Sequence, residues 1–126
     1  SEPESLDAYI LDGAYIGSEK INIVRSGKIS LNESSFDHDA FIFMEMNSQY
    51  VSLKHKSSNY EIKVDRSEFP QLGVWSKPGA PFVCIEPWQG TADFVSHNKK
   101  LGDKKGIIWV EGKGEVKKTF TMEFLS

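Results

Sequence analysis

Short runs of β-branched and aromatic residues, separated by turn-forming residues, recur along nearly the whole chain. The clearest pair lies within "YVSLKHKSSNYEIKVDR" (50–66), which has two adjacent serines at its centre. A turn at these serines places Val51 opposite Val64 on one face of the sheet and Lys54 opposite Glu61 on the other. Since apolar and charged partners fall into one register, this segment predicts a β-hairpin.

The remaining runs predict further strands and little helix. We expect helix only at "SLDAYILD" (5–12), ending at Gly13, a residue that commonly follows a helix C-terminus. About eight short strands with turn signals between them favour an all-β fold, an antiparallel β-sandwich, as a single segment over residues 1–126. Beyond the hairpin above, the expected strands are 21–24 paired with 28–31 across Gly27, 40–46 buried on both faces, 73–76 and 81–86 flanking the loop "KPGAP", and 106–111 paired with 115–125.

The charge pattern argues against several classes of partner. Eighteen acidic and fifteen basic side chains give a net charge of −3, and the lysines are spread along the chain, so nucleic acid is not an expected partner. No apolar run approaches the roughly 20 residues that cross a bilayer, and no leader resembling a signal peptide is present, so no membrane association is expected. The single cysteine, Cys84, fits a reducing compartment, and we expect a cytoplasmic protein.

The segment "PFVCIEPWQG" (81–90) places a carboxylate in an apolar and aromatic run. Strand alternation puts Glu86 on the same face as Phe82 and Cys84, and we expect the strand to end at Pro87, which cannot donate to the ladder. A carboxylate at the end of a buried strand opens onto a cleft, where desolvation disfavours its charged form and suits it to accept a proton. The alternative is a structural carboxylate, paired with a lysine or arginine or accepting backbone N–H bonds.

Aromatic residues and histidines add candidates of unequal weight. We expect Trp75 and Trp88 near the mouth of the cleft that holds Glu86, where an indole offers a flat face to a sugar ring, although packing is the ordinary role of either one. Trp109 is assigned to core or sheet surface. Among the histidines, His55 is expected in the core beside Tyr60, His97 in a solvated loop, and His38 near a site; no pair has metal-ligand spacing, so neither a metal nor a cofactor is expected.

One long segment carries a family resemblance. "FPQLGVWSKPGAPFVCIEPWQGTAD" (69–93), with "GVWSKP", "FVCIEPW" and "G.AD" in that order, resembles the galactose mutarotase (aldose 1-epimerase) family in its LacX-like branch. "LDAYILDGAYI", "DHDAFIF" and "KKGIIWVEGKGEVKKTFTMEF" are similar to the neighbouring segments of that family, so the likeness covers nearly the whole chain.

The resemblance implies a fold, a reaction and roles for three residues. Glu86 matches the family's general base, Asp39 in "DHDAFIF" the acidic group that binds a sugar hydroxyl, and Trp75 a position close to the sugar. It implies the family's large β-sandwich and an aldohexose substrate whose α and β anomers are interconverted. Family members are longer, and their histidine acid lies in an N-terminal half to which nothing here corresponds, so the resemblance is to the C-terminal portion alone.

These expectations define a leading function and its rivals. The first is an aldose 1-epimerase-like isomerase that needs the missing N-terminal half of the same protein, with the isolated 126 residues inactive. The second is a carbohydrate-binding β-sandwich module without catalysis. The third is a structural sandwich domain in which Glu86 is salt-bridged.

Overall fold

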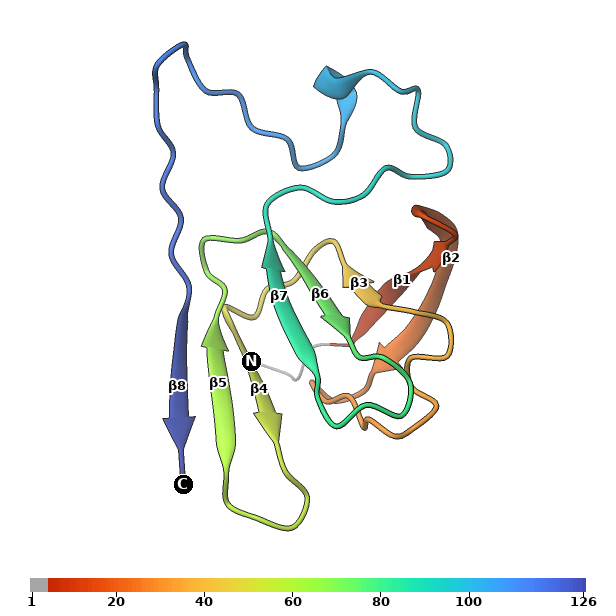
Figure 1. Ribbon diagram of the computed structural model, residues 1–126, viewed down its shortest axis with the longest axis vertical. Helices are drawn as coiled ribbons and strands as arrows, with labels where there is room; N and C mark the ends of the chain where they lie inside the picture. Colours follow the sequence, from red (N-terminus) through yellow and green to blue (C-terminus); the bar gives the residue numbers. More distant parts are fainter. Residues whose placement is uncertain (1–4) are drawn as a thin grey trace.

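The structure, a computed structural model, describes residues 5–126 and is built almost wholly from β-strands (Figure 1). The one helical element among these residues is a single 3₁₀ turn at Leu101–Asp103. Eight strands are formed: β1 (Leu6–Asp12), β2 (Tyr15–Val24), β3 (Phe41–Phe43), β4 (Tyr50–Lys54), β5 (Glu61–Asp65), β6 (Gln71–Trp75), β7 (Cys84–Trp88) and β8 (Thr121–Leu125).

The strands form two sheets. Five strands pair in the order β2-β1-β3-β6-β7, and three pair in the order β4-β5-β8, with every ladder antiparallel. In Figure 1 the smaller sheet lies beside the β6–β7 end of the larger one, and the chain after β7 passes over one end of the larger sheet before descending to β8. The predicted all-β class and antiparallel sandwich are confirmed.

The larger sheet buries apolar side chains on both faces, because neighbouring residues of a strand point to opposite sides. The two faces are distinguished by the clusters they carry. One face holds Ala8, Val24, Phe36, Phe41, Phe43, Leu72 and Val74, with Val51 of β4 packed against them. The opposite face, called the outer face below, holds Ile16, Ala40, Ile42 and Met44, with Tyr9, Leu11, Trp75, Trp88, Ala92 and Phe94 packed against them.

The predicted hairpin at 50–66 is confirmed in its register. Val51 pairs with Val64, and Lys54 pairs with Glu61, whose carboxylate lies 2.8 Å from the Lys54 ammonium. The predicted strand at 40–46 is confirmed only over residues 41–43, as β3, whose three residues are all buried. This strand is short, yet burial on both faces agrees with its apolar sequence.

Two N-terminal predictions were wrong. The predicted helix at 5–12 is instead strand β1, over Leu6–Asp12. The strand was missed because it packs apolar side chains on both faces of the sheet and so lacks the two-residue alternation typical of a half-buried strand. The pairing of 21–24 with 28–31 reduces to a tight turn in which Arg25 and Lys28 exchange backbone hydrogen bonds of 3.0 Å. Ser26 and Gly27 both have positive φ in this turn, as a primed hairpin turn requires.

The C-terminal hairpin was also wrong. Residues 106–111 form no strand, and β8 pairs with β5 from the distant hairpin. Trp109 is 78% exposed, in contrast to the core or sheet position expected for it. The segment before β8 is tethered to the loop after β5, where the Thr119 N–H donates to the Glu68 carboxylate at 2.9 Å.

Strand β7 continues past Pro87 to Trp88, so the expected end at residue 86 was wrong. Pro87 is accommodated because β7 is the last strand of its sheet and can leave one edge unpaired. None of the helical structure in residues 5–126 has the length and apolar character needed to cross a bilayer.

Candidate functional site

Glu86 lies in the middle of β7, directly opposite Gly73 of β6. Its neighbours two residues away along the strand, Cys84 and Trp88, share its side of the sheet. Cys84 is paired with Trp75, so Glu86 has one indole on each side of it along the ladder. Because both tryptophans belong to the outer face, the Glu86 carboxyl group also projects from that face.

The surroundings of Glu86 leave its carboxylate free to interact with a ligand. The residue is half-buried, and no hydrogen bond or ion pair within residues 5–126 reaches its carboxylate. The described part of the chain therefore offers no lysine, arginine or backbone N–H that would make this carboxylate a structural ion pair.

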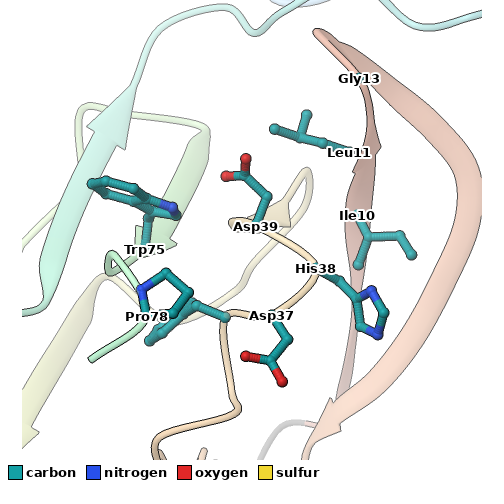
Figure 2. A pocket seen from close by; sticks show the side chains of 9 residues that line it. Ile10, Leu11, Gly13, Asp37, His38, Asp39, Trp75 and Pro78 are labelled. Atoms are coloured by element: carbon teal, nitrogen blue, oxygen red, sulfur yellow. The ribbon is translucent and has the colours of Figure 1, made fainter. Parts of the chain in front are cut away.

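A hollow of about 440 Å³ opens at the end of the outer face where β6 ends (Figure 2). Trp75 and Pro78 form one side of the hollow, Ile10 and Leu11 the other, and Asp39 projects between them. The hollow lies within the size range of small-ligand sites. Glu86 is not among the residues that line it, although it shares a sheet face with Trp75.

Asp39 is held in its position by local backbone geometry. Its φ is +70°, a left-handed conformation that aspartate tolerates better than most residues, and its Oδ1 accepts a hydrogen bond from the Ala40 N–H at 2.7 Å. The second carboxylate oxygen remains open to the hollow, since no hydrogen bond to it occurs within the described part of the chain. Two of the three predicted site residues, Asp39 and Trp75, thus meet at one hollow.

The histidines are placed differently from one another. His38 lines the same hollow as Asp39 and is exposed. His55 is exposed at the hairpin turn, where its Nδ1 accepts the Ser57 N–H at 3.2 Å, so its predicted core position was wrong. The His55 N–H still donates to the Tyr60 carbonyl at 3.3 Å, but this pair lies at the turn end of the hairpin, where both side chains are exposed.

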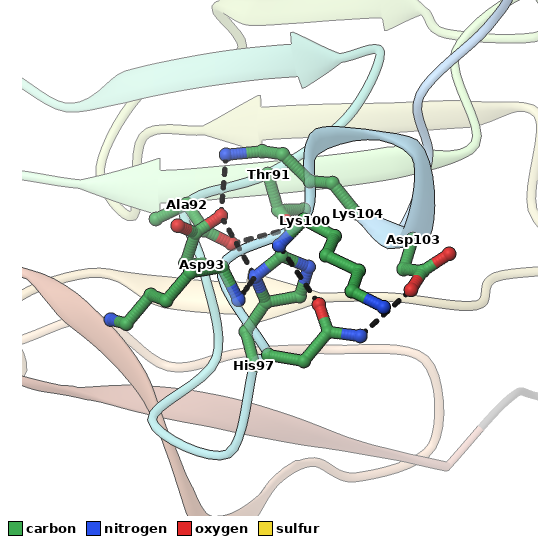
Figure 3. Close-up of polar contacts among 9 residues, drawn as sticks. Thr91, Ala92, Asp93, His97, Lys100, Asp103 and Lys104 are labelled. Atoms are coloured by element: carbon green, nitrogen blue, oxygen red, sulfur yellow. Dashed lines mark hydrogen bonds and ion pairs between the residues drawn. The ribbon is translucent and has the colours of Figure 1, made fainter.

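His97 was predicted in a solvated loop, but its side chain is only 11% exposed. Its Nδ1 accepts the Lys99 N–H at 3.1 Å and lies 3.9 Å from the Asp93 carboxylate, while Lys104 Nζ lies 2.8 Å from the same Asp93 oxygen (Figure 3). The hydrogen bond from Lys104 holds the pKa of Asp93 below its ordinary value. This network anchors the loop after β7.

Sequence reasoning missed the wall of the hollow that β1 supplies. Ile10, Leu11 and the following Gly13 line the hollow, but the segment was interpreted as helical. The signal that could have found them is the β-propensity of the tyrosine and isoleucine residues in this run. No cluster of histidine, cysteine or acidic side chains suited to a metal ion occurs within residues 5–126.

Comparisons with known proteins give consistent matches, although no protein-family model matches the sequence. The chain is 30% identical over 99 residues to two LacX proteins of Lactococcus lactis subsp. lactis, one plasmid-encoded and one chromosomal. The alignment covers 78% of this chain and 33% of each relative, so the chain spans about a third of the length of these relatives.

A solved structure extends the match to the fold. The galactose mutarotase related enzyme from Lactobacillus acidophilus superposes with a TM-score of 0.83 at 26% sequence identity, over 98% of this chain and 43% of that one. The sequence likeness to LacX and the shared architecture agree with each other. The chain is thus related in sequence to the LacX proteins and in fold to a galactose mutarotase related enzyme, which confirms the resemblance to the galactose mutarotase family.

Proposed function

We propose that the chain is the C-terminal part of an aldose 1-epimerase that interconverts the α and β anomers of an aldohexose, with Glu86 as general base. One observation carries this proposal: Glu86 is a half-buried carboxylate without a partner in the described chain, on a face it shares with two indoles. A base must be free of a competing ion pair and open enough to reach a substrate, and this environment meets both needs.

The reaction requires two coordinated proton transfers. The base removes the proton from the anomeric hydroxyl while the bond between C1 and the ring oxygen breaks, and an acid protonates that oxygen. Rotation about C1–C2 turns the other face of the aldehyde towards the hydroxyl, and reclosure returns both protons. Each positioned acid or base contributes on the order of 10²–10⁴ in rate.

The acid is assigned to a histidine outside this chain, in the missing N-terminal half of the same protein. His55 lies at an exposed hairpin turn, His97 is held beside Asp93 in the loop after β7, and His38 lines the hollow with an exposed ring. The share of the relatives that the chain spans supports a longer protein. We place this protein in the cytoplasm, with neither a nucleic acid nor a membrane as partner and without a cofactor.

Asp39 and Trp75 are the proposed substrate-binding residues. The Asp39 carboxylate projects into the hollow beside the indole of Trp75 (Figure 2). A carboxylate accepts hydrogen bonds from sugar hydroxyls, and an indole covers the C–H face of the ring. A pyranose is small enough for the hollow.

A second candidate function is supported by the position of the hollow. Because Trp75 and Asp39 line it and Glu86 does not, the same surface suits a carbohydrate-binding module that does no chemistry. In that case the carboxylate of Glu86 would have no part in turnover.

Replacing Glu86 with glutamine in the protein at its full natural length separates the two functions. For the epimerase, we expect Glu86→Gln to lower kcat for mutarotation at least about 10²-fold, because an amide cannot accept the proton, while sugar affinity stays within a few-fold of wild type. Polarimetry of freshly dissolved α-glucose or α-galactose measures the rate.

Glu19→Gln is the matched control, since Glu19 is exposed on β2, and its activity should equal that of wild type. An unchanged rate in Glu86→Gln, or sugar binding by a wild-type protein that has no mutarotase activity, would favour the binding module.

A further inference from the structure

The indole of Trp88 lies across the backbone of Gly73. A Cβ atom placed on Gly73 would be 2.7 Å from Cζ2 and 3.0 Å from Cε2 of Trp88, closer than non-bonded carbon atoms approach. The ring therefore occupies the space that any side chain at residue 73 would need. Gly73 is the ladder partner of Glu86, so the ring leans along the sheet towards the pair that contains the proposed base.

The backbone that follows Trp88 is fixed by two further contacts. The Gly90 N–H donates to Oε1 of Gln71 at 3.0 Å, and Gln71 is buried and lies opposite Trp88 in the ladder. Gln89 Nε2 donates to the Gly106 carbonyl at 2.5 Å. The indole is thus supported by Gly73 beneath it and by anchored residues immediately after it.

We propose that Trp88, seated on Gly73, is a second sugar-binding platform on the other side of Glu86 from Trp75, and that its flat face contacts C–H groups of the pyranose while Glu86 meets the anomeric hydroxyl. Gly73 is a positioning residue that keeps the indole beside the carboxylate. This inference rests on the proposed epimerase function and adds a binding residue to it. A half-buried, anchored indole is suited to the role, because it loses little conformational freedom when a ligand packs on it.

Substitutions of Trp88 in the full-length protein test the platform directly, with galactose and glucose as probes. Trp88→Leu should raise KM about two- to tenfold, the range of an aromatic contact, with kcat within about twofold of wild type. Trp88→Phe keeps a flat ring and should restore most of the affinity. If Trp88→Leu folds with an unchanged KM, the platform is excluded.

Gly73→Ala tests the position of the indole without removing it, and if Trp88→Leu fails to fold, a Gly73→Ala protein with the wild-type KM would itself exclude the platform. The added methyl group should displace the ring and raise KM in the wild-type background, but it should have no further effect when Trp88 is already leucine. Gly112→Ala is the matched control, because a Cβ there meets nothing within 4 Å. An equal effect of Gly73→Ala in both backgrounds would show that Gly73 does not act through Trp88.

Failure of the inference and failure of the proposed function give different results. If Glu86→Gln abolishes turnover while the Trp88 variants keep the wild-type KM, the proposed epimerase function is supported and the Trp88 platform is excluded. If Glu86→Gln has the wild-type mutarotation rate, the proposed epimerase mechanism is excluded, whatever the Trp88 variants show.

Discussion

At the residue scale, the ion pair between Asp93 and Lys104 makes stability depend on pH. The hydrogen bond from Lys104 lowers the pKa of Asp93 below its ordinary value of 3.8, so the folded state binds a proton there less readily than the unfolded chain. The stabilisation is therefore complete above pH about 4 and is lost as the pH falls through the lowered pKa. Lys104→Met should remove it and lower the urea midpoint at pH 7 more than at pH 3.

Lys56→Met provides the comparison, because Lys56 is exposed in the hairpin turn and has no ion pair within the described residues. Its urea midpoint should follow the wild-type value at both pH values. An equal loss for Lys104→Met at pH 7 and pH 3 would contradict a role for the Asp93 charge.

The sequence carried part of the site at this scale. Alternation predicted the side of β7 from which Glu86 projects, because that depends only on neighbours two residues away. The position of Trp75 relative to Glu86 depended on the register between β6 and β7, which the sequence did not specify. The position of Asp39 depends on its left-handed backbone conformation, which cannot be predicted from the presence of a single aspartate in the sequence.

At the scale of elements, sequence separation decided which predictions succeeded. The β4–β5 hairpin was predicted in register because its strands are joined by a short turn and cross-strand pairs could be matched directly. The strand β8 was assigned the wrong partner because its true partner, β5, lies far upstream. Local sequence patterns carry no information on a pairing between such distant strands. Strand β1 was missed for another reason: both of its faces are buried, so its sequence lacks the apolar and polar alternation of a half-buried strand.

Strand β3 shows how much a short element can contribute. Phe43 is 1% exposed and pairs with Leu72 at the centre of the larger sheet. We expect Phe43→Ala to lower the free energy of unfolding by about 3–5 kcal/mol, through lost burial and the cavity left behind. Urea denaturation followed by circular dichroism measures the change.

Phe82→Ala is the matched control, because Phe82 is 46% exposed and its removal opens no cavity in the core. Its cost should stay below about 1.5 kcal/mol, the loss of its ring contact with Trp75. Similar costs for both variants would mean that β3 does not anchor the core.

At the scale of the whole molecule, the C-terminal segment leaves apolar surface uncovered. Every residue of β8 is exposed, and β8 is an edge strand of the three-stranded sheet. In Figure 1 the segment before β8 extends beyond the end of that sheet and lies apart from the larger sheet. An exposed apolar strand at a sheet edge is suited to pairing with or being covered by another segment. The residues concerned are Ile108, Trp109, Val110, Val116, Phe120, Met122, Phe124 and Leu125.

The uncovered segment leads to a prediction for residues 1–126 alone. If the N-terminal half normally covers it, the isolated chain should self-associate with increasing concentration in sedimentation experiments and show no measurable mutarotation, because it lacks the acid. The double variant Trp109→Ser and Phe124→Ser should weaken this association, since the two side chains are 78% and 74% exposed.

Val95→Ser, at an exposed loop position beside β2, is the control and should leave the self-association unchanged. If residues 1–126 alone were monomeric and interconverted sugar anomers, then neither the covering of this segment by an N-terminal half nor an acid from that half would be needed, and both proposals would be contradicted.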